Sequence, residues 1–502
     1  MSPIDLATIV LYAGLVLGVG WSASRRHQTA QDFHLGGRDL PLPALLASLT
    51  ATELSAATFI GVPQAAFLGD WSYLQFAFGA LLGKCLVAVA VIPIYYRAGV
   101  VTVYGFLAER FGDRSRRTAA LCFVGGRILA SGVRLFIAAL ALSTATGWSL
   151  ETGIVASGLV AGLYTLVGGI RAVVWTDTLQ AAVFLAGAGA VILVIVSAAP
   201  AGFDSLLGFA SEGSRTRVFH FEPLLSLART NLFGVGLLGG FFLTLATHAT
   251  DHDMVQRLLC ARSGRAGSWT LALSGLINFP VTALFLLVGT AIAFHYEGQA
   301  PAYSIEEARR VVPLFALHEM PDGLRGLVFA GLFAAAMSSL DSAICALSTT
   351  FSVDVLGHGA NERQLVRRTR IGTAAFTTLI VLAAIAMASY QRYLDALPPA
   401  ADGVVLSLVE FALSSMTVLY GGLLGVFAWA LWGRESRDAA GVVALGVGAT
   451  TGLLLFLQPL LLGHLVISWP FWIPISSSLT LATLFVASRL GSPEPPTRRT
   501  PP

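Results

Sequence analysis

One apolar segment contains several hydroxyl side chains at helical spacing, and their chemistry indicates what they could bind. Residues 331–350 read GLFAAAMSSLDSAICALSTT. One alanine and three serines in this segment share one face of a helix, namely Ala335, Ser338, Ser339 and Ser342. Hydroxyl and carbonyl oxygens are hard ligands that suit a small cation without redox chemistry. Serines in apolar helices also bond to their own backbone or hold helices together, so both a cation site and a packing role stay open.

The remaining ligands of such a site could come from the carbonyl oxygens of a helix that is locally unwound. The apolar segment 42–68 is interrupted by the polar run TATELSAATFIG at residues 50–61. At membrane depth, irregular backbone is tolerated only where it lines a cavity. A helix unwound around Ala51 to Ser55 would offer free carbonyl oxygens to the serines, and we predict a break there.

A second interruption is predicted in the segment 230–249, where glycines at 234, 236, 239 and 240 precede Thr244 and Thr247. This is the seventh apolar segment and 42–68 is the second. Interrupted helices at matching places in two halves indicate an inverted repeat with a binding site between the halves. Glycine runs also allow close helix packing, and the sequence favours neither interpretation of this segment.

Acidic residues inside apolar segments are costly and are therefore candidates for function. They are Glu53, Asp177, Asp341 and Glu410. Asp177 can ligate a cation, relay a proton or pair with a loop arginine. Asp341 lies beside Ser342 at the edge of the serine face, and Glu410 has no partner that the sequence identifies.

Three basic residues also fall within apolar segments. Arg127 and Arg134 are seven positions apart and share one helix face, where they could hold a substrate carboxylate. Pairing with Glu53 or Glu410, or snorkelling to the interface, is the favoured alternative. Lys84 is expected to be one half of a buried ion pair. His248, near the end of its segment, is interpreted as interface polarity rather than as a metal ligand.

The composition identifies the class of protein. Of 502 residues, 55% are hydrophobic and only 12% are charged, and the mean hydropathy is +0.75. Soluble domains carry about 25% charged residues, so a soluble enzyme, a nucleic-acid binder and a disordered chain are excluded. We predict an all-α polytopic membrane protein. The sequence shows no P-loop, HExxH or GxSxG motif, so it is not expected to be an enzyme.

Thirteen apolar segments are long enough to be spans. They are approximately 5–23, 42–68, 72–96, 119–146, 151–168, 173–198, 230–249, 268–294, 326–350, 371–389, 404–432, 441–462 and 466–487. With the N-terminus outside, loops on the cytoplasmic side hold twenty-one arginines and external loops hold seven. This bias predicts an outside N-terminus and a cytoplasmic C-terminus.

In combination, several motifs resemble those of the sodium:solute symporter family. They are DFHLGGRDLP, LTATELSAATFIGVPQAAF, TVYGFLAERFG, LYTLVGGIRAVVWTDTLQAAVF, DMVQRLL and GLFAAAMSSLDSAICALS, in family order from about residue 30 to 355. The resemblance implies a LeuT-type inverted repeat of five plus five helices, with one extra helix at the N-terminus and two at the C-terminus. It also implies sodium-coupled import of a small polar or anionic organic solute by alternating access, at the cell inner (plasma) membrane.

The resemblance also divides the chain into units. They are 1–40, the N-terminal helix and loop; 41–198, the first five-helix repeat; 199–229, an external loop; 230–432, the second repeat; 433–490, two C-terminal helices; and 491–502, a proline-rich cytoplasmic tail. The partners implied are a solute and the lipid bilayer. No nucleic acid and no obligate protein partner is expected.

By resemblance, Na⁺ binds to oxygen atoms at five positions. These are the backbone carbonyls of Ala51, Leu54 and Ala335 and the hydroxyls of Ser338 and Ser339. Asp177, Asp341 and Ser342 match positions that in some members support a second cation or ion coupling. Those members have hydroxyl side chains at the positions of Asp341 and Ser342, so in this chain the carboxylate of Asp341 replaces one hydroxyl.

The substrate does not follow from the resemblance. The first repeat is most similar to that of bacterial sialic acid carriers, in which residues matching Ser55 and Thr58 contact a carboxylate, but the glutamine and arginine of that pattern are missing. Glu53 and Gln75 are the other expected substrate contacts. Two alternatives stay open: proton coupling through Asp177 or Glu53, and a membrane sensor.

Overall fold

The protein is an assembly of helices in a computed structural model, which describes residues 1–24, 35–165, 170–212, 214–297, 308–357, 362–397, 407–432 and 436–490. The helices are α1 (Pro3–Ser24), α3 (Leu42–Glu53), α4 (Ala56–Leu68), α5 (Leu74–Ala90), α6 (Ile92–Ala98), α7 (Val103–Arg110), α8 (Asp113–Thr146), α9 (Leu150–Thr165), α10 (Ile170–Ala198), α11 (Phe203–Glu212), α12 (Phe233–Thr250), α13 (His252–Leu259), α14 (Gly264–His295), α16 (Val311–Glu319), α17 (Leu324–Thr350), α18 (Glu362–Ala396), α19 (Leu408–Leu431), α20 (Asp438–Leu462) and α21 (Trp472–Leu490). A π-helical turn, Phe351–Val355, extends α17.

Within the described ranges, eleven helices are long and apolar enough to cross a membrane, and the bent pair α3–α4 makes twelve. The sequence predicts thirteen. The difference is α9, whose apolar part, Leu150–Leu163, is shorter than the others. Its predicted C-terminal end, at 166–168, falls outside the described residues. The all-helical membrane architecture is confirmed, whereas the count of thirteen is not reached by length and composition.

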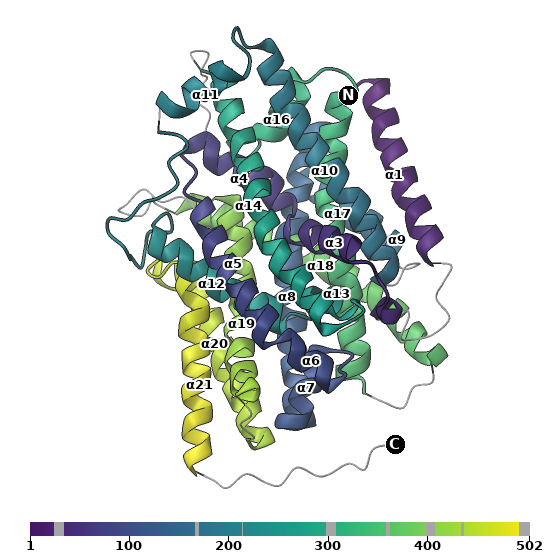
Figure 1. Ribbon diagram of the computed structural model, residues 1–502, viewed down its shortest axis with the longest axis vertical. Coiled ribbons are helices and arrows are strands. Elements are labelled where there is room, and N and C mark those ends of the chain that lie inside the picture. Colours follow the sequence, from purple (N-terminus) through teal and green to yellow (C-terminus); the bar gives the residue numbers. More distant parts are fainter. Residues whose placement is uncertain are drawn as a thin grey trace.

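The helices run mainly along the long axis of the molecule (Figure 1). The N-terminus, α11 and α16 lie at one end, and α6 and α7 lie at the opposite end. α1 lies on one flank and α21 on the other, while α3 and α4 lie between them. Large apolar side chains of the flanking helices are exposed, among them Val10, Leu11 and Leu490, as expected for surfaces that face lipid.

The second helix break does not lie where the sequence predicts it. α12 is a continuous helix through the glycines, and the chain leaves it at Asp251, whose φ of −84° and ψ of 116° are extended. α13 then begins at His252. The glycines instead let α12 pack closely against α5: a Cβ on Gly240 would lie 2.2 Å from the carbonyl oxygen of Phe76. Of the two open interpretations, close packing is therefore the one that the structure supports.

Replacing Gly240 by alanine is expected to lower the free energy of unfolding by about 1–3 kcal/mol, because the new methyl group must push α5 and α12 apart. The midpoint of thermal unfolding in detergent measures the effect. Gly189→Ala is the matched control, because a Cβ at that position meets nothing within 4 Å. Equal midpoints for the two variants would contradict the packing role of Gly240.

Candidate functional site

The predicted break in the second apolar segment is present. α3 ends at Glu53, α4 begins at Ala56, and the two helices are bent by 60° relative to one another. Leu54 and Ser55 between them are extended. The sequence encodes the restart of the helix, because Ser55 and Thr58 form a capping box: the Ser55 hydroxyl accepts from the amide of Ala57 at 3.2 Å, and the Ser55 amide donates to Oγ1 of Thr58 at 3.4 Å.

The capping box frees backbone carbonyls at the end of α3. In a continuous helix, the carbonyl of Ala51 would accept from the amide of Ser55, and that of Leu54 from the amide of Thr58. Here the Ser55 amide donates to the side chain of Thr58, and the Thr58 amide donates to the carbonyl of Ser55 at 2.8 Å. The oxygens of Ala51 and Leu54 are therefore released from their helical partners.

The serine face of α17 lies against this break. The Ser338 hydroxyl donates to the carbonyl oxygen of Ala51 at 3.1 Å and lies 3.3 Å from that of Ala335. The Ser339 hydroxyl lies 3.3 Å from the same Ala335 oxygen. Both serines are fully buried. Because the hydroxyl groups can rotate, this neutral set of oxygens fits a monovalent cation that would replace the present hydrogen bonds.

The residues of the possible second cation site lie near this face. Ser342 donates its hydroxyl to the carbonyl of Ser339, and its amide donates to Oδ1 of Asp341. Asp177 on α10 accepts from the Ser48 hydroxyl at 2.6 Å and pairs with Nη2 of Arg257 at 3.2 Å. Of the three roles that the sequence left open for Asp177, pairing with an arginine is therefore present. Oδ1 of Asp177 has no hydrogen-bond partner.

A buried ion network surrounds the second helix break. Arg127 on α8 pairs with Asp251 and Asp253, and Arg257 pairs with Asp253 at 2.8 Å as well as with Asp177. Burial alone would raise the pKa of Asp253, but the two guanidinium groups hold that pKa below its usual value. The network is a structural clamp on α13. Pairing with a buried acid is thus correct for Arg127, although its acids are neither Glu53 nor Glu410.

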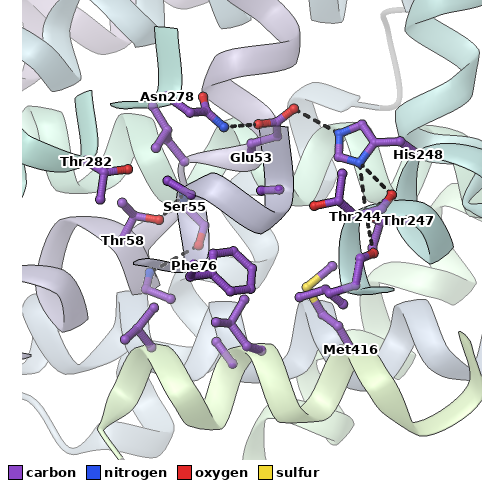
Figure 2. A pocket seen from close by; sticks show the side chains of 18 of the residues that line it. Glu53, Ser55, Thr58, Phe76, Thr244, Thr247, His248, Asn278, Thr282 and Met416 are labelled. Carbon is purple, nitrogen blue, oxygen red and sulfur yellow. Dashed lines mark hydrogen bonds and ion pairs between the residues drawn. The ribbon is translucent and has the colours of Figure 1, made fainter. Parts of the chain in front are cut away.

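A cavity of about 120 Å³ lies beside the break in α3–α4 (Figure 2). Its polar and charged lining residues are Glu53, Ser55, Thr58, Tyr73, Lys84, Arg134, Thr244, Thr247, His248, Asn278 and Thr282. Apolar side chains, among them Phe76 and Met416, complete the wall. Polar groups that converge in a mainly apolar cavity are typical of a small-molecule site.

Glu53 is the centre of a polar hub in this cavity. Its Oε2 pairs with Nζ of Lys84 at 2.5 Å and also accepts from the side-chain amide of Asn278. Its Oε1 lies 2.9 Å from Nε2 of His248. Figure 2 shows Glu53 between Asn278 and His248. The expected ion pair of Lys84 is present, and both oxygens of Glu53 are already engaged by protein groups.

Arg134 differs from Arg127 although the two share a helix face. Arg134 is 5% exposed and lines the cavity. Its Nη2 lies 3.3 Å from Sδ of Met416, and its Nη1 has no hydrogen-bond partner. In the described ranges it forms no ion pair with a carboxylate. Of the two arginines, Arg134 is thus the one that can receive a substrate anion.

Three of the four predicted substrate contacts line the cavity. Glu53, Ser55 and Thr58 line the cavity, whereas Gln75 does not. Its side chain instead donates to the carbonyl of Asn231 at 2.8 Å and accepts from the amide of His220. Gln75 thus fastens the loop before α12 to α5, and its prediction as a substrate contact is not supported by the structure.

His248 and Asn278 are two of the polar lining residues that the sequence analysis did not predict. His248 is not at an interface: it is 5% exposed and bonds to Glu53. Asn278, in the apolar segment of α14, also bonds to Glu53. A polar amide within an apolar span was the available signal for Asn278.

Glu410, which lacked a partner in the sequence, caps α19 with Ser407 and accepts from Thr230.

The model of the sodium:solute symporter family matches residues 33–431. This range covers well over half of the chain, and the chain therefore belongs to the sodium:solute symporter family. The prediction made from the motifs is confirmed. The family is one of transporters, in agreement with the expectation that the chain is not an enzyme.

Two relatives and one solved structure show what this chain is similar to. Human sodium-coupled monocarboxylate transporter 1 is 26% identical over 457 residues, which are 88% of this chain and 72% of the relative. The sodium/sialic acid symporter SiaT of Proteus mirabilis (strain HI4320) is 28% identical over 354 residues, which are 70% and 71% of the two chains. A solved Na⁺-coupled sialic acid symporter, in a substrate-bound outward-open state, has a TM-score of 0.83 at 23% identity and covers 98% of this chain and 99% of that one.

These findings establish the class of the protein. The fold is that of LeuT-type transporters, as the resemblance implied. The protein is a multi-pass membrane protein and a sodium-coupled symporter of a small solute. The division of the chain into repeats and loops stays a prediction.

Proposed function

We propose that the protein imports small monocarboxylates together with sodium. The observation that carries the proposal is the unpaired guanidinium of Arg134 in a cavity that adjoins the oxygen-lined break in α3–α4. A buried guanidinium nitrogen without a hydrogen-bond partner is costly, and a substrate carboxylate would supply that partner. Both curated relatives named above carry carboxylates by their printed names.

The charges of the cavity favour a substrate with a single negative charge. Lys84 and Glu53 pair at 2.5 Å and compensate one another. Arg134 contributes one positive charge that no described carboxylate pairs with. The hydroxyls of Ser55 and Thr58 accept from backbone amides, so their hydrogens are available to the same carboxylate. The guanidinium of Arg134 and the hydroxyls of Ser55 and Thr58 all line this cavity, where they can donate to a bound carboxylate.

The volume of the cavity favours a small solute. A cavity of about 150 Å³ holds one benzene molecule, and this cavity measures about 120 Å³. It therefore fits an acid smaller than benzene, such as acetate, propionate or lactate, more readily than a sialic acid. Apolar wall residues such as Phe76 and Met416 suit a short hydrocarbon chain.

In this proposal, sodium binds to the carbonyls of Ala51, Leu54 and Ala335 and to the hydroxyls of Ser338 and Ser339. The ion joins the broken helix to α17 and stabilises the outward-open state, because an ion shifts a conformational equilibrium only if it binds one state better. Inward opening separates α17 from the break and releases the ion. A second cation near Asp177, Asp341 and Ser342 stays a prediction from the sequence.

The orientation is part of the proposal. The arginine bias favours an outside N-terminus in the inner membrane. In Figure 1, α11 and α16, from the segments expected to be external, lie at the same end as the N-terminus, and α6 and α7 lie at the opposite end. This arrangement agrees with the expected alternation of loops.

Uptake into proteoliposomes tests the proposal. We expect labelled acetate, propionate or lactate to accumulate when an inward sodium gradient is imposed, and we expect sialic acid and glucose not to accumulate. Potassium in place of sodium should abolish the accumulation. Uptake that follows a proton gradient and ignores sodium would instead favour coupling through Asp177 or Glu53. Sodium-driven uptake of a neutral sugar would overturn the assignment of Arg134.

A further inference from the structure

We infer that Glu53 is the positioning residue through which sodium and solute strengthen each other's binding. The inference rests on the proposed function and adds to it a coupling element. It concerns a side chain that the sequence predicts to contact the substrate or, as an alternative, to couple protons, and it follows from what holds that side chain in place.

The position of Glu53 in the chain ties it to the proposed sodium ligands. Glu53 is the last residue of α3, so it precedes Leu54 directly and follows Ala51 by two positions. The carbonyls of these two neighbours are the backbone ligands proposed for sodium in the break. Any adjustment of that backbone when an ion binds must therefore move the Cα of Glu53.

The carboxylate of Glu53 contacts side chains from three other helices. Lys84 comes from α5, His248 from α12 and Asn278 from α14. All three contact the carboxylate, at 2.5 Å for Lys84 and 2.9 Å for His248. Hydrogen bonds to a charged group are stronger than neutral ones, and the burial of Lys84 and His248 shields these contacts from water.

The same three partners are walls of the substrate cavity. Lys84, His248 and Asn278 all line it. The hub thus connects the backbone that would hold sodium to the side chains that would surround the solute. A sodium ion that holds the backbone of the break in place therefore also holds these lining side chains in place. A solute that holds the lining side chains in place likewise stabilises the backbone of the break. Thermodynamic linkage requires the two effects to be equal.

The alternative is that the hub only stabilises the fold. A purely structural hub would change the stability and both affinities without changing the factor by which one ligand strengthens the other. The coupling factor, defined as the solute Kd without sodium divided by the solute Kd with saturating sodium, therefore separates the two roles.

The test uses two variants of the whole chain described above, neither of which creates a new buried charge without a partner. Glu53→Gln combined with Lys84→Met removes the ion pair as a unit, because removing one partner alone would leave an uncompensated charge. Asn278→Ala removes one arm of the hub and changes no charge. Arg392→Gln, in an exposed pair with Glu151, is the control for loss of a charge. Calorimetry or thermal shift in detergent measures the Kd of Na⁺ alone, of propionate alone, and of each in the presence of the other.

Coupling between two sites typically amounts to about a 5- to 150-fold change in affinity. We expect the coupling factor of the double variant to fall to about a fifth of the wild-type value or less, and that of Asn278→Ala to fall about twofold, while the Kd for Na⁺ alone changes by less than about threefold. The control should keep the wild-type factor. An unchanged factor in both hub variants would overturn the inference. Failure of the proposed function has a different signature, because the wild-type protein itself would then bind no propionate or would show no effect of sodium.

Discussion

Replacing Ser338 and Ser339 together by alanine is expected to abolish sodium-driven uptake. Each hydroxyl that contacts a charged group contributes about 1.5–3 kcal/mol. The loss of both therefore amounts to about 3–6 kcal/mol, or a weakening of sodium binding by about a hundredfold to ten-thousandfold. Both side chains are fully buried and lie against the carbonyl oxygen of Ala335, so water cannot easily substitute for them.

The measurement is initial uptake in proteoliposomes as a function of sodium concentration. Ser348→Ala is the matched control, because Ser348 is a buried serine of the same helix whose hydroxyl lies 3.3 Å from that of Thr373 on α18. We expect the control to keep the sodium dependence of the wild type. If the double variant retained it as well, the sodium ion would have to bind elsewhere.

Replacing Arg134 by glutamine is expected to have the second largest effect. Removing one partner of a buried charge pair costs about 2–5 kcal/mol, which corresponds to an increase in the KM for a monocarboxylate of about thirtyfold to a few thousandfold. Because Arg134 forms no ion pair with a described carboxylate, the variant should fold as well as the wild type.

The same variant separates the two ligands of the transporter. Arg134→Gln should keep the stabilisation of the purified protein by sodium alone, and Arg134→Lys, which preserves the charge but not the planar fork, should recover part of the uptake. Saturable uptake of a monocarboxylate with unchanged KM in Arg134→Gln would show that another residue receives the carboxylate.

The fold and the proposed sodium site could be predicted from short-range patterns. The break at Leu54 and Ser55 follows from a polar run inside an apolar segment, and the capping box that causes it lies within four residues. The serine face follows from helical periodicity alone. Both features are local, so the sequence contains all the information needed to place them.

Features that depend on tertiary contacts could not be predicted in this way. Arg127 and Arg134 look alike in the sequence, but Arg127 meets Asp251 and Asp253 while Arg134 faces the cavity. The partners of Glu53 come from three other helices, at separations of 31, 195 and 225 residues along the chain. The glycines of α12 are compatible with unwinding and with close packing, and only the approach of α5 decides between them.

Gln75 is a predicted substrate contact whose side-chain direction also depends on tertiary contacts. Its position in the third apolar segment made it a reasonable substrate contact, but its amide is turned toward the loop that precedes α12. The direction of a side chain on a helix depends on the neighbours that pack around it, which the spacing of residues along one segment does not describe.

Equilibrium binding of radioactive sodium to the purified protein tests the proposed cage most directly, because it depends on neither substrate nor transport. We expect saturable binding to the wild type and to Ser348→Ala, and no detectable binding to the Ser338→Ala, Ser339→Ala double variant at the same sodium concentrations. Sodium binding of wild-type affinity in the correctly folded double variant would contradict the assignment of the ion to the gap between α3 and α4.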